Sequence, residues 1–137
     1  MTLAPTQIDH FRIERVLGRG GMGVVYLARD ERLGRAVALK LLSDVELHDE
    51  PARERFLREA RVAASLRHPN IATIYEVGNE LGKPWIAMEY CEGESLSTRI
   101  LGEPFAADEF LSVAEQLASG LAAAHRGNVV HRATRRH

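Results

Sequence analysis

A glycine cluster near the N-terminus is followed by a strand-like segment, and this order limits the folds open to the chain. Gly18, Gly20 and Gly23 form the pattern Gly-x-Gly-x-x-Gly, and residues 24–28 read Val-Val-Tyr-Leu-Ala. Because β-branched and aromatic residues favour strands, a strand and not a helix is predicted after the glycines. A dinucleotide-binding turn requires a helix at that point, and a Walker loop requires Gly-Lys-Ser/Thr, which the sequence lacks. The glycines are therefore predicted to join two antiparallel strands, as a loose hairpin or as a loop that covers phosphates.

The first two thirds of the chain predict a sheet with one helix. Strand character extends over residues 11–17, 24–28 and 35–42, and again over 71–77 and 84–90. Between these two groups, a helix is predicted from Pro51 to Leu66, because proline suits a first helical turn and apolar residues recur there at helical spacing. The pattern therefore predicts an α+β fold with a five-stranded antiparallel sheet.

The last third predicts helices. A short helix is expected at residues 96–101 and a longer one at 106–126, with Gly127 as its C-cap. The apolar stripe of the longer helix consists of Phe110, Val113, Leu117, Leu121 and Ala124.

Composition excludes several classes of protein. The 137 residues fit one domain, and 45% hydrophobic with 27% charged residues is typical of a folded globular chain. A net charge of −1 gives no sign of nucleic-acid binding. The single cysteine, Cys91, excludes an internal disulfide, and the six histidines lack metal-binding motif spacing. With no apolar leader or membrane segment, we expect a cytoplasmic protein without a metal site.

Two charged residues lie in apolar surroundings. Lys40 alternates with Ala36, Ala38 and Leu42 on one strand face, so its ammonium group must reach water, pair with an acid or bind an anion. Glu59 lies three residues after Phe56, within the predicted apolar stripe of its helix. A Lys40–Glu59 pair would satisfy both charges, although each could also reach solvent alone.

Five segments in this order resemble the N-terminal lobe of a protein kinase, in the style of bacterial serine/threonine kinases of the eukaryotic-like type. They are Leu17-Gly-Arg-Gly-Gly-Met-Gly-Val-Val-Tyr26, Val37-Ala-Leu-Lys40, Phe56-x-x-Glu59, His68-Pro-Asn-Ile71 and Met88-Glu-Tyr-Cys91. Their common order is far more specific than any one of them, and the resemblance extends from about Ile8 to Arg132.

The resemblance implies ATP as cofactor, with magnesium in the family, and a role for each matching residue. Lys40 would contact the α- and β-phosphates and Glu59 would hold it in place. The residues implied to bind ATP are Leu17, Gly18, Gly20, Gly21, Gly23, Val25, Ala38, Lys40, Met88, Glu89, Cys91 and Ser95. The glycines would cover the phosphates, and Leu17, Val25, Ala38 and Met88 would line the adenine pocket. Glu89 and Cys91 would bind adenine through their backbone, and Ser95 would lie near the ribose.

The resemblance fails at the catalytic loop. Kinases have His-Arg-Asp there, with an Asn five residues later, whereas this sequence reads His131-Arg132-Ala133 and ends at His137. Alanine cannot accept a proton from a substrate hydroxyl. The Asp-Phe-Gly motif that binds magnesium is also missing, as is most of the C-lobe that would bind a protein substrate. We therefore expect at most weak ATP binding and no meaningful catalysis.

The resemblance divides the chain into three parts. Residues 8–92 correspond to the ATP-binding N-lobe, 93–132 to the hinge exit and first helices of an incomplete C-lobe, and 133–137 to a divergent tail. Three hypotheses remain open: an active serine/threonine kinase, a truncated pseudokinase-like module that binds nucleotide or protein, and a non-functional gene fragment.

Overall fold

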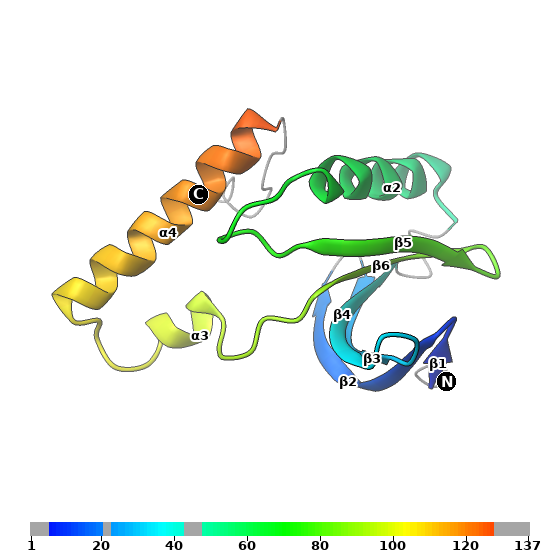
Figure 1. The fold of residues 1–137 in the computed structure, drawn as a ribbon, viewed down its shortest axis with the longest axis horizontal. Helices are drawn as coiled ribbons and strands as arrows, with labels where there is room; N and C mark the ends of the chain where they lie inside the picture. Colours follow the sequence, from blue (N-terminus) through cyan, green and yellow to red (C-terminus); the bar gives the residue numbers. More distant parts are fainter. Residues whose placement is uncertain (1–5, 21–22, 43–47, 128–137) are drawn as a thin grey trace.

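The computed structural model describes residues 6–20, 23–42 and 48–127, which form one curled antiparallel sheet with a helix packed on it and two helices to one side (Figure 1). The sheet order is β1-β2-β3-β4-β6-β5. The strands are β1 Gln7–Ile8, β2 Phe11–Gly20, β3 Gly23–Asp30, β4 Arg35–Leu42, β5 Ile74–Glu80 and β6 Lys83–Glu89. All five predicted strands are present. The sheet has six strands because Gln7 and Ile8 also pair with β2, and two residues are too few to show strand alternation.

The helices are α2 Glu50–Ala64, α3 Leu96–Ile100 and α4 Ala107–Arg126, close to the predicted ranges. Helix α2 begins after Asp49, whose side chain accepts a hydrogen bond from the Ala52 backbone N–H at 3.5 Å, and Pro51 lies in its first turn. Helix α4 ends at Gly127, as predicted.

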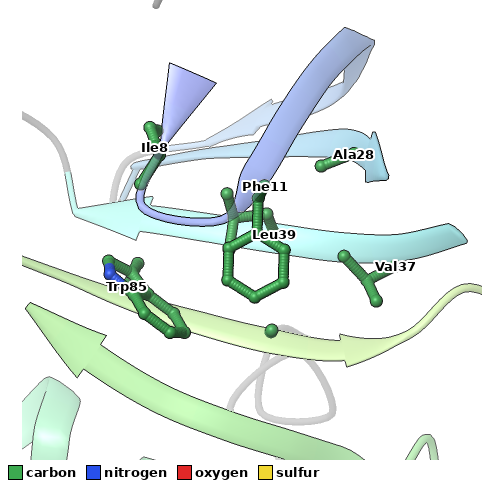
Figure 2. Packing of buried hydrophobic residues seen from close by; sticks show 7 residues of the cluster. Ile8, Phe11, Ala28, Val37, Leu39 and Trp85 are labelled. Atoms are coloured by element: carbon green, nitrogen blue, oxygen red, sulfur yellow. The ribbon is translucent and has the colours of Figure 1, made fainter. Parts of the chain in front are cut away.

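The sheet has two packed faces. On one face, buried residues from β1, β2, β3, β4 and β6 form a core in which the Phe11 and Trp85 rings meet edge to face at 5.0 Å (Figure 2). On the other face, Leu42 and Ile86 pack against Phe56 and Ala60 of α2. The members of the first core are Ile8, Phe11, Ala28, Val37, Leu39, Trp85 and Ala87.

A bulge in β5 changes which face its residues occupy. Ile74 pairs with Met88 but Glu76 pairs with Ala87, so Tyr75 is an extra residue between them. Paired residues share a face, and neighbouring residues of β6 point to opposite faces. Ile74 therefore packs on the α2 face, while Glu76 lies on the face of the Phe11–Trp85 core.

Helix α4 is attached to the loop that follows α2. The His68 Nδ1 atom accepts the Asn70 backbone N–H at 3.0 Å, so in neutral His68 the other nitrogen, Nε2, is the donor to Ser119 Oγ, also at 3.0 Å. The Asn70 side chain donates to Gln116 at 3.3 Å. A Cβ at Gly120 would lie 2.9 Å from the Asn70 carbonyl oxygen, so the close approach of loop and helix requires glycine there.

The β5–β6 hairpin contains an exposed leucine in a strained conformation. Leu81 and Gly82 both have positive φ, 51° and 83°, as in a type I′ turn, and the Leu81 side chain is 98% exposed. Asparagine tolerates this conformation far better than leucine.

We expect Leu81→Asn to raise the free energy of unfolding by about 0.5–1 kcal/mol in urea denaturation. Leu33→Asn is the matched control, because Leu33 is also an exposed turn residue but is not among the residues with positive φ. An equal gain in both variants would contradict the explanation.

Candidate functional site

Lys40 lies at the centre of the sheet. It occupies the middle of β4 and pairs with Val25 of β3 and Ile86 of β6. Its Nζ atom lies 5.7 Å from the centroid of the Phe56 ring on α2, within the range of a cation–π contact. The ammonium group is therefore on the side of the sheet that α2 covers, as alternation along the strand predicts.

The residues expected around adenine lie on that same face. Ala38 pairs with Met88 and with Leu27, two positions along the strands from Lys40. Since side chains two residues apart point the same way, Val25, Ala38, Lys40 and Met88 share one face of the three central strands. Ala38 is buried and Met88 is partly buried against the α2 core.

The glycine segment forms the hairpin between β2 and β3. Gly18 pairs with Val25 and Gly20 with Gly23, and a register shift between Val16 and Gly18 makes Leu17 an extra residue of β2. Gly23 has a φ of 147°, which L side chains rarely adopt. A Cβ at Gly18 or Gly20 would meet nothing within 4 Å. Gly21 lies outside the described residues.

Glu59 lies on α2, three residues after Phe56, and is more exposed than its position in the apolar pattern predicts. The buried residues of the helix are Ala52, Phe56 and Ala60. The three buried residues are four positions apart and form a narrow stripe along the helix. Glu59 lies beside this stripe and is exposed to solvent. The Lys40–Glu59 pair stays a prediction.

The end of β6 and the segment after it contain the remaining predicted residues. The Glu89 backbone N–H donates to the Thr73 carbonyl at 2.8 Å, and its side chain accepts the Thr73 N–H at 3.1 Å. The Cys91 thiol is exposed. Ser95 is the N-cap of α3, where its hydroxyl accepts the Thr98 backbone N–H at 3.2 Å. Sequence reasoning missed this capping role, although a serine directly before a predicted helix is its usual signal.

The arrangement suits an anionic ligand with a flat apolar group. The hairpin brings backbone of β2 and β3 next to the sheet face that carries Lys40, and Ala38 and Met88 continue that face as an apolar surface. Ala133, at the position that resembles the catalytic aspartate, lies outside the described residues. No helix in the described part of the chain is both long and apolar enough to cross a lipid bilayer.

Comparison with known proteins gives matches over most of the chain. Serine/threonine-protein kinase PrkC of Bacillus subtilis is 44% identical over 128 residues, which are 93% of this chain and 20% of that protein. Serine/threonine-protein kinase PknJ of Mycobacterium tuberculosis is 42% identical over 122 residues, 89% of this chain and 21% of that protein. The chain thus spans about a fifth of the length of these curated relatives.

A solved structure agrees with the fold. The crystal structure of the Mycobacterium tuberculosis PknI kinase domain superposes with a TM-score of 0.78 at 32% identity, and the match covers 96% of this chain and 54% of that chain. The family model described as the protein kinase domain matches residues 11–134. The chain therefore belongs to the protein kinase family, and it corresponds to the N-terminal part of the kinase domain.

Proposed function

We propose that this chain is the ATP-binding part of a serine/threonine protein kinase and that it binds ATP on the sheet face that carries Lys40. The observation that supports this most directly is the presence of Gly18 and Gly20 where the protein itself does not need glycine.

Two other glycines, Gly78 and Gly34, have structural reasons that Gly18 and Gly20 lack. Gly78 lies against the Trp85 indole, where a Cβ would approach Cζ2 to 2.2 Å, and Gly34 has a positive φ of 67°. The fold itself explains those two. At Gly18 and Gly20 a side chain would have open space, yet glycine in a strand costs about 0.5–1 kcal/mol relative to alanine. A ligand that approaches the backbone closely, as a phosphate group does, accounts for this choice.

The proposed roles follow the family resemblance. Lys40 supplies the positive charge for the α- and β-phosphates, and Glu59 on α2 positions it. The apolar face receives adenine, and the backbone at the end of β6 and directly after it binds the adenine edge through Glu89 and Cys91. The residues proposed to contact ATP are Leu17, Gly18, Gly20, Gly21, Gly23, Val25, Ala38, Lys40, Met88, Glu89, Cys91 and Ser95. Bound magnesium would offset phosphate charge, and no residue of this chain is assigned to it.

We further propose that this chain alone transfers little or no phosphate. Ala133 has no group to accept the proton of a substrate hydroxyl, and the neighbouring residues 134–137 contain no carboxylate side chain. The second candidate is therefore a pseudokinase-like module that acts in the cytoplasm by binding nucleotide or protein. Incubation with labelled ATP and a generic protein substrate tests for phosphate transfer, which neither candidate predicts. Transfer above background would favour an active kinase.

The two lysines of the chain allow a matched test of ATP binding. ATP at about ten times its dissociation constant adds about 1.4 kcal/mol of stability, which corresponds to a Tm increase of about 5 °C for a domain of this size. We expect Lys40→Met to weaken ATP binding about tenfold or more, because it removes a charge-assisted hydrogen bond. Lys83→Met, at the exposed start of β6, should leave the thermal shift unchanged. Absence of any shift at millimolar ATP would argue against nucleotide binding.

A pair of glycine variants separates binding from stability. We expect Gly20→Ala to weaken ATP binding while the free energy of unfolding stays the same or rises by up to about 1 kcal/mol. Gly78→Ala should have the opposite effect on stability. Its Cβ would clash with Trp85, so we expect the free energy of unfolding to fall by about 1–3 kcal/mol. At temperatures where Gly78→Ala is folded, its ATP affinity should match that of the parent chain. Urea denaturation and ATP titration measure the two effects. If Gly20→Ala bound ATP normally, the phosphate-covering role would be wrong.

A further inference from the structure

A group of metal-ligating side chains lies on the sheet face opposite Lys40. His10 is in the turn between β1 and β2, Asp30 is the last residue of β3, and Glu76 is on β5. The His10 Nε2 atom is 3.0 Å from Glu76 Oε2 and 4.0 Å from Asp30 Oδ2. One ligand atom from each of the three residues lies within 4.8 Å of the other two.

These distances suit one small cation. Zinc binds imidazole nitrogen and carboxylate oxygen at about 2.0–2.2 Å, so two of its ligands in a tetrahedron lie about 3.4 Å apart. The two measured separations from His10, 3.0 and 4.0 Å, fall on either side of that value. Small rotations of the two carboxylates would bring all three atoms onto one ion. One imidazole with two carboxylates is a donor set typical of zinc and similar transition metals.

Further hydrogen bonds fix the orientation of two of the proposed ligands, His10 and Asp30. Asp9 Oδ1 lies 3.0 Å from His10 Nδ1, and a carboxylate at that nitrogen fixes the ring with Nε2 toward the cluster, as in many zinc sites. Asp30 Oδ1 accepts the backbone N–H groups of Arg32 and Leu33 at 2.9 and 3.0 Å. This leaves Oδ2 as the oxygen that faces His10.

Burial and charge favour a cation over a proton. The His10 and Asp30 side chains are only 9% and 3% exposed. A proton on Nε2 would bond to Glu76 but not to Asp30, since 4.0 Å exceeds hydrogen-bond length. A divalent ion in the same place would neutralise both carboxylates.

The fold brings these residues together through two irregularities. The bulge at Tyr75 turns Glu76 to the face of the Phe11–Trp85 core. The curl of the sheet then brings the start of β2 to β5, although three strands, β3, β4 and β6, lie between them in the sheet order. The sheet already joins the end of β3 to the start of β2, because Asp30 pairs with Phe11 and the Glu31 N–H donates to the His10 carbonyl at 2.9 Å. An ion bound here would therefore add a link from β5 to this β2–β3 end.

We propose that His10, Asp30 and Glu76 bind a divalent transition-metal ion of the zinc class, with Asp9 orienting His10, as a structural cross-link of the sheet. The site lies on the other face of the sheet from Lys40, so the inference is independent of ATP binding. It differs from the expectation, based on motif spacing alone, that the chain has no metal site.

The test uses zinc chloride and the full 137-residue chain without nucleotide. Isothermal titration should detect one zinc site that is weakened about tenfold or more in Glu76→Gln and about 10–100-fold in Asp9→Asn. Glu80→Gln is the matched control. The Glu80 carboxylate accepts the Asp9 backbone N–H at 3.1 Å, which an amide oxygen can also do, and it is not a proposed ligand. Its zinc affinity should stay within about twofold of the parent chain.

The single tryptophan supplies a local readout. The Trp85 ring centroid is 6.1 Å from that of His10, so copper(II), a strong quencher, should reduce Trp85 fluorescence in the parent chain and in Glu80→Gln but not in His10→Asn. Circular dichroism of each metal-free variant confirms folding. The proposal is overturned if zinc does not bind, or if zinc affinity is the same in Glu76→Gln, Asp9→Asn and the parent chain, because the ion would then occupy other histidines.

Discussion

The contact between Phe11 and Trp85 determines much of the rest of the structure. The two residues belong to β2 and β6, which are separated in the sheet by β3 and β4, and their rings meet only because the sheet curls (Figure 2). Each strand of a sheet is twisted relative to the next, and this twist accumulates across several strands. The Trp85 ring also lies against Gly78, where no side chain fits. The aromatic pair thus stabilises the curled form of the sheet, and Trp85 also accounts for the glycine at position 78 of β5.

Alternation along the strands divides the chemistry between the two faces of this sheet. Leu39 and Ala87 belong to the aromatic core, while Lys40 and Ile86, one residue further along each strand pair, face α2. The residues proposed for ATP and those proposed for a metal ion therefore lie back to back. The two groups do not compete for the same positions, because the side chain of each strand residue points to only one face of the sheet.

Local patterns in the sequence predicted the elements well. Pro51 and the apolar spacing after it located α2, and alternation placed Ala38 and Lys40 on one face. The missed features depend on contacts between distant residues. Glu76 faces His10 only because of the bulge at Tyr75, and no local pattern distinguishes that bulge from a regular strand. For the same reason the cluster of His10, Asp30 and Glu76 escaped a search for metal-binding motifs, which relies on short spacing.

Helix α4 is attached to the rest of the chain away from the residues proposed to bind ATP. The described polar contacts between α4 and the sheet unit come from the short loop after α2, through His68 and Asn70. The side chains proposed for adenine and phosphate come from β2, β3, β4 and β6, and α4 contributes none of them. Helices α3 and α4 meanwhile expose Leu96, Ile100, Phe110, Leu111 and Leu117. Exposed apolar area of this kind is costly in water, whereas the sheet with α2 has a buried apolar core on each face. The residues proposed to bind nucleotide therefore lie in the sheet with α2, whereas the groups that a kinase uses to transfer phosphate follow the segment that corresponds to α4.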